Sequence, residues 1–278
     1  MGGYRGIIVV VIMLACAPIQ GNASSQAKRV VSINLCTDEL LLSLAERHQI
    51  LSVSFLSTQP EYSYYWDQLD GISINRGLAE EILPLKPDLV LAGKYTTVAA
   101  VNFLRAFGLN VEQIEIPQDF AGVYSSIRKV GELIGAEKKA KVIISEMKLK
   151  MDNIRKRTAG QPTLQAAILA PNNFTSGINT FKSKLIEAAG FENIAGRYGI
   201  DWYGTLSLEH IVESQPDVLI IDNSTANKNS LADRLLQHPA LRRGMLNTKI
   251  LDMPPALWAC GGPITVKALD ILESYHAK

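Results

Sequence analysis

The sequence has few of the residues that build metal centres and enzyme active sites. Among its 278 residues there are four His and three Cys, whereas a receptor for a free zinc or manganese ion uses several His and carboxylate ligands. The motifs G-x-G-x-x-G, G-x-x-x-x-G-K-[ST], G-x-S-x-G and H-E-x-x-H are absent, so the common nucleotide-binding, hydrolase and zinc-protease sites are not indicated. These absences favour a binding protein over an enzyme.

The chain also lacks an excess of either charge. It has 28 Lys and Arg against 27 Asp and Glu, for a net charge of +1. A nucleic-acid-binding surface needs a surplus of positive side chains on one face, so no nucleic-acid partner is expected. The hydrophobic content of 47% is that of a globular protein, and the length suffices for one large domain or two ordinary ones.

Long apolar runs are missing except near the N-terminus. The stretch Ile7–Ala17 follows an early Arg and is too short to span a bilayer comfortably. Small residues follow it, so residues 1–23 are predicted to be a signal peptide and the mature protein is expected in the periplasm. The alternative is a lipoprotein attached through Cys16, which follows the letters "MLA".

The remaining sequence alternates short aliphatic runs with helical patterns. Because the aliphatic runs lack strict polar alternation, they are typical of parallel strands covered on both faces. The predicted strands are Val30–Asn34, Ile50–Ser54, Asp88–Ala92, Val111–Ile116, Leu164–Leu169, Val218–Asp222 and Lys249–Asp252. The predicted helices between them are Thr37–Glu46, Ala99–Phe107, Phe181–Ala189, Ser207–Ser214, Leu231–Gln237 and Thr265–Tyr275.

A helical tract without a strand separates the two series of strands. It runs from Ala121 to about Arg157 and is divided by Gly135, and its second part has an apolar stripe that includes Ile144, Met147 and Ile154. The sequence therefore predicts an α/β fold with two lobes, each with a mostly parallel sheet, joined by one long helix. The expected boundaries are 24–135 for the N-terminal lobe, 136–160 for the linking helix and 161–278 for the C-terminal lobe.

One phrase occurs twice. "EEILPLKPDLVLAG" and "LEHIVESQPDVLIID" each place a Glu, Glu80 or Glu209, seven positions before the Pro of a Pro-Asp pair. The proline ends a helix and the aliphatic residues start a strand, which explains Pro-Asp structurally. Both glutamates point away from the buried helix face. They either complement the helix dipole or form a matched pair of carboxylates, one per lobe, for a binding partner.

Five phrases, in this order along the chain, resemble the periplasmic substrate-binding proteins that serve ABC importers for cobalamin and ferric siderophores. They are "RVVSINLCTDELLLSLA", "AEEILPLKPDLVLAG", "LIGAEKKAK", "FTSGINTFKSKLIEAAGFENIAG" and "HPALRRGMLNTKILDMPPALWACGGP". The resemblance implies a monomer whose two lobes hold ligand in the cleft between them and close only slightly, because the linking helix is stiff. It also implies that Glu80 and Glu209 dock onto Arg pockets of the two membrane permease subunits, with Glu81 as a neighbour that could share this role.

Ligand groups in α/β lobes come from loops beyond the carboxyl ends of strands. These loops contain all three Trp of the chain, and aromatic rings offer the large flat contact area that a macrocycle or chelate needs. Trp202 stands where the cobalamin-binding members of the resembling family carry a Trp. The candidate cleft residues are Trp66, Tyr65, Tyr95, Phe174, Trp202, Tyr203, Trp258, Cys36 and Cys260.

The two cysteines outside the N-terminal segment leave alternatives open. A pair in an exported protein could form a disulfide, but a disulfide across the cleft would restrain loading and release. We therefore expect Cys36 and Cys260 to be small cleft-lining residues. A different class of function would make Cys260 the nucleophile of an enzyme, although no paired His is apparent.

The expected cargo is a metal chelate rather than a covalently bound cofactor. Few Arg lie in the candidate loops; Arg76 and Arg197 are the nearest. A strongly anionic catecholate chelate would need more positive charge. The sequence therefore favours cobalamin or a neutral Fe(III) hydroxamate-type chelate, with a heme receptor of the same fold as the alternative.

Overall fold

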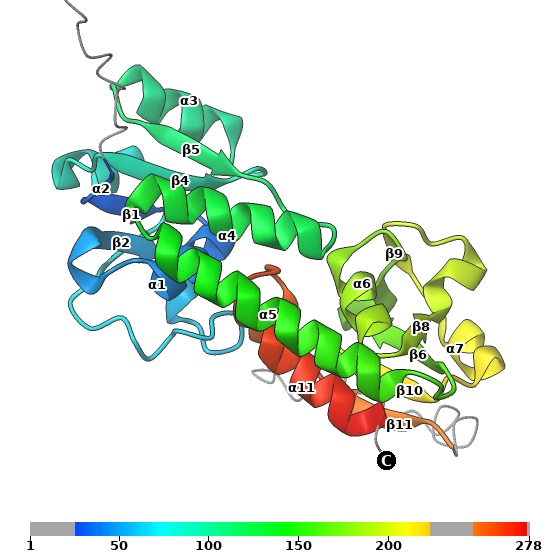
Figure 1. Cartoon of the computed structure of the whole chain (residues 1–278). Coiled ribbons are helices and arrows are strands. Elements are labelled where there is room, and N and C mark those ends of the chain that lie inside the picture. The colour runs from blue at the N-terminus through cyan, green and yellow to red at the C-terminus, as the bar shows by residue number, and fades with distance from the viewer. Residues whose placement is uncertain (1–25, 223–246, 277–278) are drawn as a thin grey trace, which may run out of the picture.

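The computed structural model describes residues 26–222 and 247–276 and has two lobes, each built on its own sheet (Figure 1). The two-lobed α/β architecture with parallel sheets is therefore confirmed. The predicted signal peptide, Cys16 and the predicted helix Leu231–Gln237 lie outside the described residues. In the part of the chain that is described, no helix is both long enough and apolar enough to cross a membrane.

The sheet of the N-terminal lobe has five parallel strands in the order β3-β2-β1-β4-β5. Every residue of β4 is buried, as expected for a central strand with helices on both faces. The short strand β3 was not predicted because "SIN" has a single aliphatic residue. The strands are β1 (Val30–Ser32), β2 (Ile50–Ser54), β3 (Ser73–Asn75), β4 (Leu89–Gly93) and β5 (Val111–Ile114).

Helices cover both faces of this sheet. The apolar side chains of α1 (Leu35–Leu44) and α4 (Phe120–Ile134) belong to one buried cluster. Those of α2 (Ala79–Ile82) and α3 (Val98–Ala106) belong to another on the opposite face. Since parallel strands present the same edge, the loops after β1, β2, β4 and β5 meet at one end of the lobe.

The sheet of the C-terminal lobe has four parallel strands in the order β11-β10-β6-β8. A separate antiparallel pair, β7 and β9, lies beside it. Neither this pair nor β8 was predicted, because each of these strands has only three residues. The strands are β6 (Leu164–Leu169), β7 (Phe174–Ser176), β8 (Phe191–Asn193), β9 (Tyr203–Thr205), β10 (Val218–Ile221) and β11 (Lys249–Asp252). The helices are α6 (Phe181–Ala188), α7 (Leu208–Ser214), α10 (Pro255–Trp258) and α11 (Thr265–His276).

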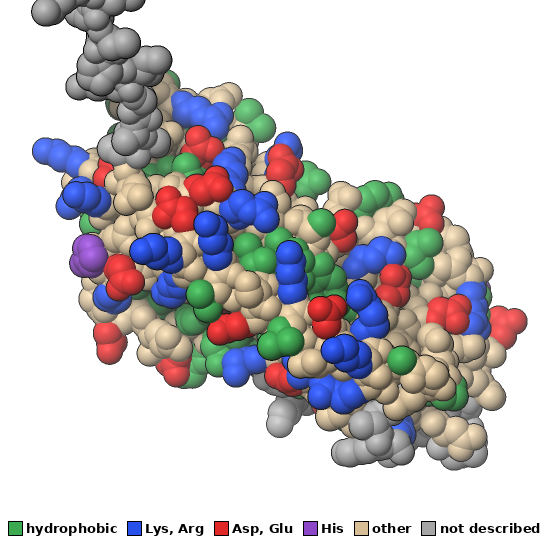
Figure 2. Space-filling view, viewed as in Figure 1, with side chains coloured by type: hydrophobic (Ala, Val, Ile, Leu, Met, Phe, Trp, Pro, Cys, Tyr) green, Lys and Arg blue, Asp and Glu red, His purple; other side chains and the backbone are tan. Residues whose placement is uncertain are grey.

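The long helix α5 (Glu137–Thr158) crosses from one lobe to the other with α11 beside it (Figure 1). Gly135, at φ +76°, ends α4 in the left-handed conformation and lets the chain turn into α5. On α5, Lys150 forms ion pairs with Asp270 and Glu273 of α11. Figure 2 shows Lys and Arg interspersed with Asp and Glu over this face, with no large patch of one charge.

The repeated phrase folds in the same way in both lobes. Lys86 and Gln215, which precede the two prolines, are both left-handed, with φ values of 47° and 42°. The next Asp then binds the neighbouring strand: Asp88 accepts hydrogen bonds from two backbone N–H groups just before β1, and Asp217 accepts one from a backbone N–H of β6. Each Pro-Asp pair thus follows the end of a helix and precedes a strand, as predicted. The contact of its Asp with the adjacent strand was not predicted.

Candidate functional site

Five of the predicted cleft aromatics expose much of their side chains. The exposed fraction of Tyr95 is 82%, and that of Tyr203 is 61%. Since a folded protein gains from burying such rings, several exposed rings in the segments that follow the parallel strands indicate a surface for contact with another molecule. The five are Trp66, Tyr95, Phe174, Trp202 and Tyr203. Tyr65 is half-buried.

The C-terminal lobe presents a stacked aromatic pair. The antiparallel pairing of β7 with β9 brings Phe174 and Tyr203 together, with ring centroids 5.8 Å apart and planes inclined by 10°. Burial raises the pKa of Tyr203, and the charge of Tyr95 adds to this effect. Tyr95 belongs to the N-terminal lobe, so this electrostatic effect on Tyr203 comes from the other lobe.

The turn that carries Tyr95 is fixed at its base. Gly93 ends β4 beside the Asn34 side chain, and a Cβ at Gly93 would lie 2.7 Å from an Asn34 atom, so a larger residue does not fit. The neighbouring Lys94 forms an ion pair with Glu115 at 2.6 Å. The side-chain hydrogen bond to Glu115 raises the pKa of Lys94. Lys94 is therefore paired with a residue of its own, N-terminal lobe.

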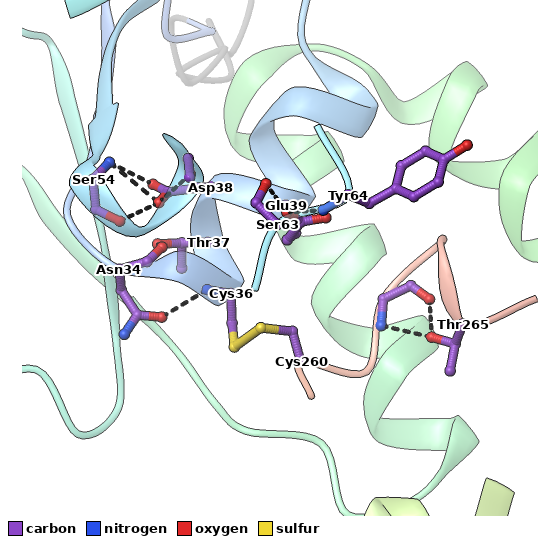
Figure 3. The surroundings of a disulfide bond; sticks show 12 residues. Asn34, Cys36, Thr37, Asp38, Glu39, Ser54, Ser63, Tyr64, Cys260 and Thr265 are labelled. Carbon is purple, nitrogen blue, oxygen red and sulfur yellow. Dashed lines mark hydrogen bonds between the residues drawn. A yellow bond between two sulfur atoms is a disulfide. The ribbon is translucent and has the colours of Figure 1, made fainter. Parts of the chain in front are cut away.

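Two buried carboxylates of α1 hold the aromatic loop, residues 55–68 (Figure 3). Asp38 accepts hydrogen bonds from the backbone N–H and hydroxyl of Ser54 and, at 2.8 Å, from the hydroxyl of Ser57. Glu39 accepts from the Ser63 hydroxyl at 2.6 Å and from the backbone N–H of Tyr64 at 3.2 Å. This role was not predicted, because acidic residues near the start of a helix are ordinarily explained by the helix dipole.

Burial changes the protonation of these acids. Desolvation raises the pKa of Asp38 and raises that of Glu39 to about 7, against the hydrogen bonds that lower both. The Glu39 Oε2 atom is buried without a hydrogen-bond partner among the described residues. Burial, together with the nearby Glu39 charge, raises the pKa of Tyr65 to about 12.

We predict that Glu39→Gln reduces the pH dependence of stability. The unfolded Glu39 releases its proton near pH 4.5 and the folded one near pH 7, so the folded protein binds more protons between these values and loses stability as pH rises through them. At pH 8 the variant should therefore be more stable than the wild type by about 1–3 kcal/mol, and at pH 4.5 the two should be similar.

Urea denaturation at pH 4.5, 6 and 8 measures this difference. The raised pKa of Asp38 contributes with the same sign in both proteins, so the difference between them reports Glu39 together with its electrostatic coupling to Asp38. Glu132→Gln, at an exposed position on α4, is the matched control and should follow the wild type. Parallel pH curves for Glu39→Gln and the wild type would contradict the prediction.

A hollow of about 340 Å³ lies between the lobes. The aromatic loop forms one wall, with Tyr64, Trp66 and neighbouring residues, and the segment Pro254–Leu257 of the C-terminal lobe forms the other. This opening has the size of a small-molecule site, and both of its walls contain apolar side chains. Its residues include Trp66 of the predicted set.

Cys36 and Cys260 form a disulfide, with their Cα atoms 5.0 Å apart (Figure 3). The expectation of unpaired cleft-lining cysteines is therefore wrong. The first turn of α1 and the turn between α10 and α11 meet between the lobes, and the sequence separation of 224 residues gave no sign of this. The enzyme alternative needed a thiolate at Cys260, and the disulfide removes it.

Trp258 is also placed differently from the prediction that it lines the cleft. Only 1% of it is exposed, and its indole N–H donates a 2.9 Å hydrogen bond to Asp222. Lys182 forms an ion pair with the same carboxylate and lies over the Trp258 ring. Trp258 therefore stabilises α10 in the lobe core, and sequence reasoning missed both of its polar partners because they lie in distant segments.

The two glutamates of the repeated phrase are exposed in the first turns of α2 and α7. Hydrogen bonds from its own backbone and from the Ser207 side chain lower the pKa of Glu209, which keeps this carboxylate charged. Glu81 differs from Glu80, because it accepts a 2.6 Å hydrogen bond from the backbone N–H of Arg76. Glu80 forms no ion pair with a described residue, so it is the freer of the two acids.

Residues 26–222 and 247–276 contain no group of three or more His, Cys, Asp or Glu side chains able to hold a metal ion. Three cations near the cleft loops have partners within their own lobe: Lys94 with Glu115, Lys182 with Asp222, and Arg197 with Glu192.

Comparison with known proteins identifies the class of the chain. A family model described as periplasmic binding protein matches residues 30–246. An uncharacterized ABC transporter substrate-binding lipoprotein of Bacillus subtilis is 25% identical over 259 residues, covering 89% of this chain and 79% of the relative. A cobalamin-binding protein of Halobacterium salinarum is 28% identical over 217 residues, covering 76% of this chain but only 58% of the relative.

Among solved structures, the periplasmic heme-binding protein of Vibrio cholerae is similar, with a TM-score of 0.75. The alignment covers 88% of this chain and 97% of that chain, at 20% sequence identity. At this identity the likeness establishes the fold alone. Relatives described by different ligands thus share one architecture, so the ligand must be argued from the cleft.

Proposed function

The chain belongs to the periplasmic binding protein family, and from this membership we propose that it captures a metal chelate between its lobes and delivers it to an ABC-type importer. The lobes are residues 24–135 and 161–278, and residues 136–160 link them. The protein acts in the periplasm after removal of residues 1–23, or from a membrane through a lipid on Cys16. The lipoprotein description of the Bacillus relative favours the second route.

One observation carries the proposal: exposed aromatic rings lie on both lobes. Tyr95 of the N-terminal lobe is near enough to Tyr203 of the C-terminal lobe to affect its pKa, and Phe174 stacks on Tyr203. Aromatic rings held by well-packed turns contact a broad ligand at a low cost in conformational entropy. We assign Trp202 and Tyr65 to the same site, and Trp66 lines the hollow.

The cargo is cobalamin or a ferric chelate of low charge. A catecholate chelate carries several negative charges and would need unpaired cations, whereas Lys94, Lys182 and Arg197 are paired within their lobes. The relatives described as cobalamin-binding support the first choice. The partner in delivery is a two-subunit membrane permease, which Glu80 and Glu209 would contact.

A heme-binding function is the second candidate, and the exposed Tyr95 and Tyr203 favour it. A phenolate oxygen is one of the protein ligands that hold heme iron, and Tyr95 and Tyr203 both expose their side chains. A flat porphyrin would also stack on Phe174. Hemin titration distinguishes this candidate, because iron ligation by a phenolate gives the visible spectrum a phenolate-to-iron charge-transfer band that stacking alone does not produce.

We predict that Tyr95→Ala and Tyr203→Ala each weaken binding of the cargo about tenfold, because each removes roughly 1.4 kcal/mol of contact. Equilibrium dialysis with cobalamin, a ferric hydroxamate and hemin measures the effect. Phe107→Ala is the matched control, since Phe107 is 58% exposed in the same lobe at the end of α3. Equal affinities of all three variants and the wild type would show that Tyr95 and Tyr203 do not contribute to binding of the cargo.

A further inference from the structure

The Cys36–Cys260 disulfide is a covalent connection between the lobes in addition to the chain itself. Cys36 lies in the first turn of α1 in the N-terminal lobe, and Cys260 lies just after α10 in the C-terminal lobe. The polypeptide crosses between the lobes through α5. The lobes are therefore connected covalently at two different places, the helix α5 and the disulfide. Two connections restrict the movement of the lobes more than a helical linker alone does.

In the N-terminal lobe, rigid contacts join the disulfide to one wall of the hollow. Asp38 and Glu39 are two and three residues beyond Cys36 in the same helix, and both are buried. They hold the aromatic loop at Ser57, Ser63 and other donors (Figure 3). A shift of the first turn of α1 would thus be transmitted to the loop that carries Tyr64 and Trp66.

In the C-terminal lobe, the opposite wall ends only three residues before Cys260. This wall, Pro254–Leu257, is followed by Trp258, whose ring is buried and bonded to Asp222. Gly261, the residue after Cys260, lies where there is no room for a side chain. A Cβ there would lie 2.7 Å from Pro117 of one lobe and 3.1 Å from Phe181 of the other. The turn is therefore packed between both lobes.

The disulfide is also accessible to a thiol reagent. Cys36 and Cys260 are half-buried rather than sealed in the core. Disulfides that retain contact with solvent can be attacked by a thiolate, and the amide dipoles at a helix N-terminus favour the departing thiolate of a cysteine in that position. Cys36 occupies such a place, with Asn34 as the helix N-cap.

We propose that this disulfide is a positioning element of the ligand pocket, and that its reduction by a dithiol separates the two pocket walls and speeds release of the cargo. A thiolate of the dithiol bonds to one sulfur while the S–S bond breaks, and the other cysteine leaves as a thiolate and takes a proton. The second thiol of the reductant then attacks the reductant's first sulfur, and the cysteine still bonded to that sulfur leaves as a thiolate and takes a proton. Two cysteine thiols therefore form, and the dithiol becomes a disulfide. The release part rests on the proposed function, whereas the movement of the walls does not.

Hydrogen exchange of the ligand-free protein tests the movement. The oxidised protein, the protein reduced with dithiothreitol, and Cys36→Ser/Cys260→Ser are compared over seconds to minutes, well below their melting temperatures. We expect amides of residues 60–68 and 254–262 to exchange at least about tenfold faster in the last two samples. Strands β1, β4 and β10 should stay protected in all three. Reoxidation should restore slow exchange, and dithiothreitol should not affect the serine variant.

Unchanged exchange at both walls, with two new thiols counted, would overturn the proposal. Exchange of β1, β4 and β10 amides within the same seconds to minutes would also overturn it, because the walls would then open only through global unfolding. Cobalamin release, followed by tryptophan fluorescence, should become about tenfold faster on reduction. Failure of cobalamin, hydroxamate and hemin to bind at all would count against the proposed function, while the exchange result would still decide the movement of the walls.

Discussion

Replacing both Glu80 and Glu209 by Arg is expected to lower chelate import at least about 100-fold without changing chelate affinity. The two exposed carboxylates occupy equivalent first-turn positions on helices that lead into Pro-Asp and a central strand. In the proposed complex each would bind a guanidinium group of one permease subunit, and a reversed charge replaces that attraction by repulsion. Loss of about 3 kcal/mol across the two contacts is sufficient for this reduction.

Cells whose own copy is deleted, supplied with each variant, provide the import measurement, and dialysis provides the affinity. Glu132→Arg/Glu146→Arg changes the net charge equally at exposed positions on α4 and α5 and should import normally. Glu81→Gln should also import normally, because this side chain bonds to the backbone of its own lobe. Normal import by the Glu80/Glu209 variant would refute the docking role and indicate a binder that never meets an importer.

Loss of the Cys36–Cys260 disulfide is expected to lower the free energy of unfolding by about 4 kcal/mol. A cross-link between residues 224 positions apart restricts the unfolded chain strongly, and long loops gain most from this effect. For a chain of this size the melting temperature should fall by about 10 °C. The loss should be the same in Cys36→Ser/Cys260→Ser and in the reduced wild-type protein.

Thermal melts followed by circular dichroism, with and without dithiothreitol, measure this change. The serine variant serves as its own control, since dithiothreitol has no bond between residues 36 and 260 to break in it. A fall of less than 1 °C in the reduced protein would be inconsistent with a restrained unfolded chain. In that case residual structure would already restrict the unfolded chain as much as the disulfide does.

Elements with strong local signals were predicted well from the sequence. Runs of Val, Ile and Leu gave β1, β4, β6 and β10, because a central parallel strand has to be apolar on both faces. The repeated Pro-Asp phrase gave the matching helix-to-strand turns. The apolar stripe of α5 gave the long helix, whose Ile144, Met147 and Ile154 are buried.

The site itself depends on contacts that no local pattern encodes. Trp258 was assigned to the cleft from its loop, but a short helix turns its ring towards Asp222, 36 residues earlier in the chain. In the sequence Glu39 has no feature that distinguishes it from an exposed helix residue. It is buried because the aromatic loop packs over it. The Cys36–Cys260 pair required knowledge of how two distant turns meet. In each case the deciding partner belongs to another segment, and propensity reasoning cannot supply it.

Isothermal titration of the wild-type protein with cobalamin, a ferric hydroxamate and hemin measures whether the protein binds a metal chelate. We expect one of these compounds to bind with a stoichiometry of one per chain and a dissociation constant below about 1 μM, equivalent to roughly −8 kcal/mol. The compound should be recovered chemically unchanged. No binding by any of the three, or conversion of the bound compound into a product, would contradict the account.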